Sequence, residues 1–273
     1  MKIAVIQVAY GEGADESVEE RAARVAGLVR THGAGHDLVV LPELWSAGGF
    51  AAREWEARSQ SLSGAALPPA LAPLAEAARH TGAVLHAGSV VERTDEPGPQ
   101  GRHLWNTSVL LGPDGEVLET YRKVHRFGFG AGEPRLMEAG EELVVTDLPA
   151  PADGLVTGLS TCYDLRFPEL YRRLVDLGAE LFLVPAAWPE PRIEAWRLLL
   201  RARAIEDQCF VVACNTAGEH AGQRMGGRSA VISPTGEVLA EAGTGEEVLS
   251  VDIDPALVRT VRAGFPVLDD RRL

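Results

Sequence analysis

The feature that most constrains this chain is its alternation of short apolar runs with segments of helical spacing. Residues 2–10 (KIAVIQVAY) form an apolar run, whereas residues 15–33 place apolar side chains every three or four positions after a Ser17-x-x-Glu20 pattern typical of a helix N-terminus. The first pattern is typical of a buried strand and the second of an amphipathic helix. The alternation continues, which predicts an α/β fold with parallel strands joined by helices. Further strands are expected at 36–44, 83–92, 155–164, 180–188, 209–218 and 246–254, and further helices at 68–82, 167–179 and 192–208.

Two segments have instead the pattern of β-hairpins. Residues 106–123 contain two apolar runs around Pro-Asp-Gly, and residues 229–243 repeat this form around Pro-Thr-Gly. Turns of this kind join antiparallel strands. The chain is therefore expected to contain mixed sheets. This periodicity fits two architectures. One has two sheets packed face to face with helices outside, and the other has one open sheet.

The length and charge of the chain limit its architecture and its partners. A chain of 273 residues buries roughly three quarters of its surface on folding, so a single domain over residues 1–273 is expected. The formal net charge of −13 disfavours nucleic acid and anionic membranes as partners, because phosphates attract Lys and Arg. No apolar run approaches the ~20 residues of a membrane span, and the N-terminus lacks a cleavage pattern. A soluble, cytoplasmic protein is therefore expected.

The cysteines and histidines do not have the spacing of a disulfide framework or a metal site. The three cysteines, Cys162, Cys209 and Cys214, are odd in number and widely spaced. The seven histidines form no HxH or HExxH pattern, and the glycine-rich stretches match no nucleotide-binding loop. No metal and no other cofactor is expected, and the thiols remain free for chemistry.

Three of the expected strands end in residues that can do chemistry, namely Glu43, Lys123 and Cys162. Active residues of α/β proteins lie beyond the carboxyl ends of strands. Cys162 is the best candidate nucleophile, because a helix N-terminus and a nearby cation both lower the pKa of a thiol. The N–H of Tyr163 could then face an oxyanion. Cys209 and Cys214 lie inside an apolar strand, where a structural role is expected.

Each of these residues also has a structural interpretation. Cys162 could be a small buried hydrophobe, and Glu43 could cap a strand end. Lys123 could belong to a solvated basic cluster with Arg122, His125 and Arg126. A further alternative makes His125 the general base for Cys162, as in Cys–His hydrolases.

The motifs LPELW, YRKVHRF and STCYDLRFPEL carry Glu43, Lys123 and Cys162 in that order. Together with PAAWP, RARAIEDQ and GGRSAVISPTGEVLAEAG, they make the chain resemble the nitrilase superfamily of carbon–nitrogen hydrolases, from AVIQVAY to about Ile253. The resemblance implies a four-layer α-β-β-α sandwich with two mixed sheets that pairs as a homodimer. The helix from Trp196 to Gln208 and the C-terminal tail, about 255–273, are candidates for the dimer interface.

The resemblance also implies the roles of the site residues. Glu43 is implied to be the general base, Lys123 to stabilise the oxyanion and Cys162 to attack the amide carbon, without a cofactor. Glu133, in GAGEPRL, is the best match to a second glutamate that positions the site in many members. The products implied by the resemblance are ammonia and an acid, which form through a thioester intermediate.

The substrate is constrained less closely than the reaction. The string CYDLRFPEL resembles the branch that contains omega-amidases and deaminated-glutathione amidases, which favours a small, carboxylate-bearing linear amide over a nitrile. Arg166 could pair with a substrate carboxylate or form a salt bridge with Glu169 or another acid. Tyr163 and Trp188 are candidate pocket walls. A carbamoyl-amide hydrolase, an acyl transferase using the same cysteine, and a non-catalytic dimeric binding module are the alternatives.

Overall fold

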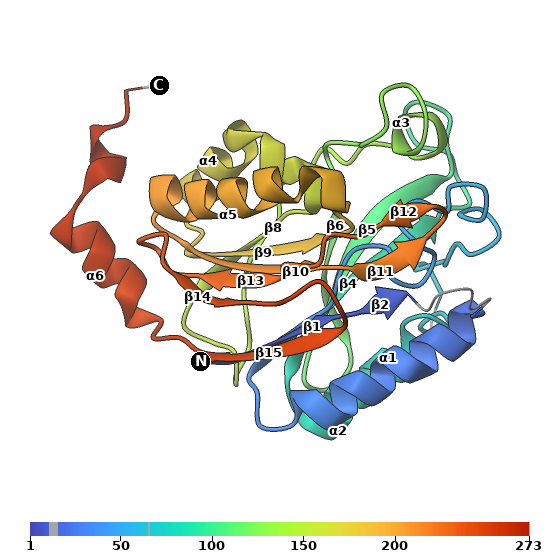
Figure 1. The fold of residues 1–273 in the computed structure, drawn as a ribbon, viewed down its shortest axis with the longest axis horizontal. Helices are drawn as coiled ribbons and strands as arrows, with labels where there is room; N and C mark the ends of the chain where they lie inside the picture. The colour runs from blue at the N-terminus through green and yellow to red at the C-terminus, as the bar shows by residue number, and fades with distance from the viewer. Residues whose placement is uncertain (11–15, 65, 273) are drawn as a thin grey trace.

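The computed structural model describes residues 1–10, 16–64 and 66–272, and two six-stranded sheets form its centre (Figure 1). In each sheet the inner strands are parallel, β1–β3–β4 and β8–β9–β10, and the outer strands pair antiparallel. Both sheets are therefore mixed, as expected. The first sheet has the order β15 (Glu247–Asp252), β1 (Lys2–Gln7), β3 (Leu38–Val40), β4 (Val84–Arg93), β5 (Leu104–Leu111), β6 (Val117–Arg122). The second has the order β14 (Val238–Glu241), β13 (Ala230–Ile232), β10 (Phe210–Asn215), β9 (Leu181–Ala186), β8 (Val156–Leu159), β7 (Val145–Asp147).

Helices cover the outer face of each sheet. Helices α1 (Val18–Gly33) and α2 (Ala72–Thr81) pack on the first sheet, and α4 (Pro168–Asp176) and α5 (Ile193–Asp207) pack on the second (Figure 1). Alternation along β1 shows the layering, since Val5 lies in the core between the sheets and Ile6 lies in the core beneath the helices. The α-β-β-α sandwich is confirmed, and the single open sheet is excluded.

Local signals in the sequence account for several of these elements. Ser17 caps α1, since its hydroxyl accepts from the Glu20 N–H at 3.1 Å and the Glu20 carboxylate accepts from the Ser17 N–H at 2.9 Å. Asp15, where this helix was expected to start, lies outside the described residues. Both expected hairpins are present, as the antiparallel pairs β5–β6 and β13–β14. None of the described helices is both long and apolar enough to cross a membrane.

Other elements differ from the expected boundaries. Strand β3 ends at Val40 rather than residue 44, because Pro42 has no N–H to continue the ladder. The run 209–218 divides into β10 and β11 (Ala217–His220), and β11 joins β2 (Ala9–Tyr10) and β12 (Gln223–Arg224) in a small third sheet. The expected C-terminal tail contains α6 (Ala256–Gly264) and the 3₁₀ turn η3 (Val267–Asp270), at one end of the molecule (Figure 1).

Candidate active site

Two carboxylates and one ammonium group meet where the two sheets approach each other. Lys123 follows β6, Glu43 follows β3, and Glu133 begins the short helix α3 (Glu133–Leu136). The Lys123 Nζ lies 2.7 Å from Glu43 Oε1 and 3.0 and 2.9 Å from the two carboxylate oxygens of Glu133. All three side chains are at most 4 % exposed. The structure therefore brings Glu43 into contact with Lys123 and Glu133, which lie at least 80 positions later in the sequence.

Asn106, on β5, belongs to the same cluster and was missed by the sequence reasoning. Its Nδ2 donates to Glu43 Oε1 at 2.8 Å and to Glu133 Oε1 at 2.6 Å. The signal that could have identified it was a run of polar residues, Asn106 to Ser108, inside a fully buried strand. Asn106 and Lys123 thus donate jointly to both carboxylates.

The backbone after β3 holds Glu43 against the second sheet. The Glu43 N–H donates to the carbonyl of Ala186, the last residue of β9, at 3.3 Å, and the Ala187 N–H donates to Glu43 Oε2 at 2.8 Å. Strand β4 approaches this segment so closely that a Cβ at Gly88 would lie 1.9 Å from the Pro42 carbonyl oxygen. Both sheets therefore fix the position of this carboxylate.

Cys162 begins the 3₁₀ turn η1 (Cys162–Arg166), which follows β8, and its φ of 49° is in the left-handed region. Non-glycine residues in that region cost about 1 kcal/mol or more and cluster at functional sites. The Cys162 residue is 8 % exposed. Burial and the neighbouring Glu43 carboxylate raise the pKa of Cys162 well above its ordinary value. The expectation that this pKa is lowered was wrong, because desolvation and a nearby anion outweigh the Lys123 cation.

Desolvation and neighbouring charges also decide the charge states of Lys123 and Glu133. Burial would lower the pKa of Lys123, but the Glu133 and Glu43 carboxylates outweigh it and raise this pKa well above its ordinary value. Burial also raises the pKa of Glu133, although Lys123 and Asn106 act in the opposite direction. Lys123 is therefore a stable buried cation, and Cys162 is a neutral thiol at rest.

A cavity opens above Cys162. Its walls include the three residues expected to contact substrate, Tyr163, Arg166 and Trp188. The Arg166 guanidinium lies 4.9 Å from the centre of the Trp188 ring. No ion pair joins it to Glu169 within the described part of the chain, so the salt-bridge alternative is not supported.

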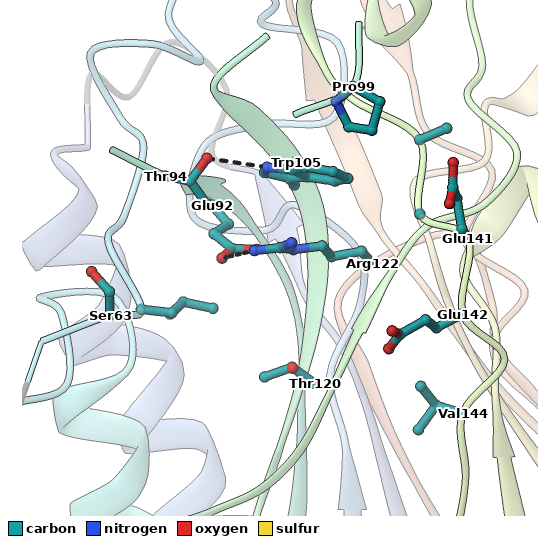
Figure 2. A pocket seen from close by; sticks show the side chains of 13 residues that line it. Ser63, Glu92, Thr94, Pro99, Trp105, Thr120, Arg122, Glu141, Glu142 and Val144 are labelled. Carbon is teal, nitrogen blue, oxygen red and sulfur yellow. Dashed lines mark hydrogen bonds and ion pairs between the residues drawn. The ribbon is translucent and has the colours of Figure 1, made fainter. Parts of the chain in front are cut away.

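The basic residues around Lys123 separate into different environments. Arg122 points into another groove, where its guanidinium pairs with Glu92 at 2.7 Å and lies 4.2 Å from the centre of the Trp105 ring (Figure 2). His125 Nδ1 lies 2.8 Å from Asp164 Oδ1, and its ring stacks on Phe167. The solvated-cluster interpretation therefore fails for Lys123, and His125 is engaged by Asp164 rather than by the thiol.

The remaining cysteines are structural, as expected. Cys209 and Cys214 are fully buried, and their thiols donate to the carbonyls of Ala179 and Ile6, each at 3.2 Å. Within residues 1–10, 16–64 and 66–272, no three His, Cys, Asp or Glu side chains are grouped so that they could hold a metal ion.

Comparisons with known proteins agree with this geometry. The family profile of carbon–nitrogen hydrolases matches residues 2–263. The chain is 43 % identical over 272 residues to a 2-oxoglutaramate amidase from Paenarthrobacter nicotinovorans, covering 100 % of this chain and 90 % of that protein.

Two solved structures share the fold. The crystal structure of XC1258 from Xanthomonas campestris, a CN-hydrolase superfamily protein with an arsenic adduct in its active site, has a TM-score of 0.86 and 31 % identity, covering 100 % of this chain and 97 % of that one. A mutant amidase from Nesterenkonia sp. AN1, with acrylamide added at its active-site cysteine, has a TM-score of 0.74 and 26 % identity, covering 98 % and 99 %.

Proposed function

The chain belongs to the carbon–nitrogen hydrolase family, and we propose that it hydrolyses the terminal amide of a small carboxylate-bearing ω-amide. The reaction releases ammonia and an acid through a thioester on Cys162. The observation that carries the proposal is the buried cluster of Glu43, Lys123 and Glu133 beside the thiol. The likeness to a 2-oxoglutaramate amidase supports an ω-amide of a dicarboxylic acid as the substrate.

In the first half of the reaction Glu43 acts as the general base. The raised pKa of Cys162 means that the thiol needs a base, and Glu43 is the neighbouring carboxylate that acts on it. The sulfur attacks the amide carbon as Glu43 takes its proton. The Lys123 ammonium and the Tyr163 N–H then stabilise the negative charge on the former carbonyl oxygen. Glu43 returns the proton to the leaving nitrogen, ammonia departs, and a thioester remains.

In the second half water replaces ammonia. Glu43 takes a proton from water as its oxygen attacks the thioester carbon, and the same two donors stabilise the oxyanion. The carbon–sulfur bond breaks, Glu43 returns the proton to the sulfur, and the acid product is released. Lys123 keeps its charge throughout, since two carboxylates raise its pKa.

Glu133 acts as a positioning residue for Lys123. Its carboxylate accepts from Lys123 Nζ through both oxygens and from the Phe127 N–H at 2.6 Å. These contacts hold the ammonium group at one place while Glu43 exchanges protons. Preorganised donors stabilise a transition state because they need no rearrangement during the reaction.

Arg166 binds the substrate carboxylate, while Tyr163 and Trp188 form walls for the carbon chain. Arg166 lines the cavity above Cys162 with its guanidinium against the Trp188 ring. A guanidinium presents a fork of N–H donors that matches a carboxylate. We place this reaction in the cytoplasm, where three unpaired thiols remain reduced.

Ammonia release from a panel of dicarboxylate monoamides, carbamoyl amino acids and nitriles tests the proposal. We expect the monoamides to be hydrolysed and the Cys162→Ala variant to release no ammonia above background. Cys214→Ala, which changes a buried thiol inside β10, is the matched control and should remain active. Hydrolysis by Cys162→Ala at the normal rate would contradict the proposal, as would a wild-type protein that acts on no amide.

A further inference from the structure

A second guanidinium lines the cavity that contains Cys162. Arg192, the last residue of the turn η2 (Glu190–Arg192), lines this cavity together with Arg166. Its guanidinium lies 5.0 Å from the centre of the Phe127 ring. Among the residues that the structure describes, those that line the cavity include two arginines and neither aspartate nor glutamate. The cavity wall therefore carries two positive charges that its own side chains do not neutralise.

These two arginines are unusual within the described part of the chain. Both are half-buried, and neither guanidinium has an ion pair or hydrogen bond to a described residue. Half-buried cations normally have an anionic or carbonyl partner, because desolvation is otherwise uncompensated. The other half-buried arginines of the described chain each have such a partner: Arg24, Arg58, Arg102, Arg122, Arg126, Arg172, Arg228 and Arg262.

The surrounding contacts hold both guanidinium groups toward the cavity. Trp188 supports Arg166 with its ring face, and its Nε1 donates to the Arg192 carbonyl at 2.8 Å. Phe127 supports the Arg192 guanidinium, and the Phe127 ring packs edge-to-face on Tyr163. Aromatic rings thus contact both cations in the cavity that Cys162 also lines.

The cavity offers donors but few acceptors. Each guanidinium has only N–H donors. The nearby Trp188 carbonyl already accepts from the Gly226 N–H at 2.9 Å and from Asn215 Nδ2 at 3.1 Å, and the Arg192 carbonyl accepts from Trp188. A 2-oxo acid presents acceptor oxygens alone, on its carboxylate and its oxo group. A 2-amino acid adds an ammonium group, which needs acceptors and is repelled by two cations.

We propose that Arg192 is a specificity-determining residue that, with Arg166, makes this site select the ω-amide of a 2-oxo acid over that of the corresponding 2-amino acid. The inference rests on the proposed function, since it concerns the far end of the same substrate. Arg166 binds the carboxylate, and Arg192 donates hydrogen bonds to the neighbouring oxo oxygen. Glutamine is excluded because its ammonium group meets two guanidinium groups and no acid.

Steady-state kinetics of Arg192→Leu with 2-oxoglutaramate, glutamine and the neutral amide butanamide tests this inference. We expect kcat/KM for 2-oxoglutaramate to fall roughly 10- to 100-fold, mainly through KM, as for the loss of a charge-assisted hydrogen bond. The ratio of kcat/KM for 2-oxoglutaramate to that for glutamine should fall at least about tenfold. The inhibition constant of 2-oxoglutarate should rise in parallel.

Three further measurements distinguish a loss of substrate selectivity in Arg192→Leu from a general loss of activity. Butanamide hydrolysis should change by less than about threefold, because that substrate has no group for Arg192 to contact. Arg192→Lys, which keeps the charge but loses the fork, should give an intermediate ratio. Arg173→Leu, on the exposed face of α4, is the matched control and should leave every constant unchanged.

The kinetic results can distinguish failure of this inference from failure of the proposed amidase function. An unchanged selectivity ratio and inhibition constant in Arg192→Leu would overturn this inference while leaving the amidase proposal intact. An equal loss with every substrate would assign Arg192 a structural role and would overturn it too. A wild-type protein that hydrolyses none of the amides would overturn both.

Discussion

One ammonium group shared by two buried carboxylates dominates the candidate site at the level of single residues. Lys123 donates to Glu43 and to Glu133, and Asn106 donates to the same pair. Ionised carboxylates are stable in a buried site only when such donors compensate for lost water. Asn106 therefore supports the ionised form of Glu133 together with Lys123, whose charge has the larger effect on that pKa.

Replacing Asn106 with alanine should lower kcat by roughly 10- to 100-fold, because a buried hydrogen bond to a charged group contributes about 1.5–3 kcal/mol. Asn106 lowers the pKa of Glu133, so its loss should raise that pKa and move the acidic limb of the pH–rate profile to higher pH. The pH dependence of kcat and of kcat/KM measures the two effects. Thr107→Ser keeps the hydroxyl that donates to Glu92 and controls for disturbance of β5. An unshifted acidic limb in Asn106→Ala would contradict this role.

Site residues could be predicted from the sequence where they lie at recognisable strand ends. They could not be predicted where only the fold brings them to the site. Glu43 and Cys162 follow apolar strands and Lys123 follows the second strand of a hairpin, so their convergence at strand ends could be expected. Asn106 lies inside a strand, and only the approach of β3 and α3 gives its amide two carboxylates to bind. The direction of the pKa shift of Cys162 could not be predicted from the sequence either, because it depends on burial and on the proximity of Glu43.

Asp164 links two secondary-structure elements that carry catalytic candidates. Its carboxylate accepts from the Tyr121 hydroxyl of β6 at 2.7 Å and from the Thr161 N–H at 2.9 Å. It also contacts His125 through the backbone N–H at 2.9 Å and through Nδ1 at 2.8 Å. The turn that presents Cys162 is thereby attached to the segment that presents Lys123.

We expect Asp164→Asn to destabilise the protein by about 2–4 kcal/mol, since an amide cannot accept from all of these donors. Activity should fall as well, because Cys162 loses its fixed position relative to Lys123. Urea unfolding and the rate of ammonia release measure the two effects. Asp176→Asn on α4 is the control, because its pair with Arg271 is largely exposed and should contribute less than about 1 kcal/mol. Wild-type stability in Asp164→Asn would show that this linkage is unimportant.

The elements were predicted well where pattern and turn chemistry agree, as in the hairpins and the capped helix α1. Their boundaries were less predictable, because β3 and β8 leave their sheets early to place Glu43 and Cys162. Helix α6 was not predicted at all. Its apolar residues Leu257, Val258 and Val261 have helical spacing, but the segment follows a proline and lies at the chain end.

At the scale of the whole molecule, the two-sheet packing buries a histidine without charge compensation. His86 of β4 is fully buried, its Nδ1 accepts from the Gly88 N–H at 3.2 Å, and its Nε2 has no partner among the described residues. Burial lowers the pKa of His86 from 6.5 to about 4. The folded state therefore holds this imidazole neutral at a pH where the unfolded chain protonates it.

The free energy of unfolding should consequently decrease as the pH falls from about 6.5 to 4. Each pKa unit of separation is worth about 1.4 kcal/mol, so the full effect is on the order of 3 kcal/mol. Urea unfolding at pH 7 and 4.5 should show a smaller loss in His86→Asn, which keeps an acceptor for Gly88. Burial of His220, whose pKa is also lowered to about 4, should preserve part of the dependence. The exposed His80→Asn is the control, and equal slopes in His86→Asn and wild type would contradict this assignment.

The assembly stays a prediction, since a homodimer involves surfaces beyond a single chain. Leu198 and Ile205 of α5 are 69 % and 50 % exposed, which is consistent with the expected interface on that helix. The sandwich itself was predictable, because the family resemblance specified it. Periodicity alone did not, since buried strands look alike in one sheet or two.

Mass spectrometry of the protein, quenched with acid during turnover of 2-oxoglutaramate, tests whether Cys162 forms a thioester. We expect a transient mass increase equal to the acyl group of the substrate, located on the peptide that contains Cys162. Hydroxylamine should remove this group and yield a hydroxamate in place of the acid. An acyl group on any other residue would contradict the account, as would product formation with unmodified protein at every quench time.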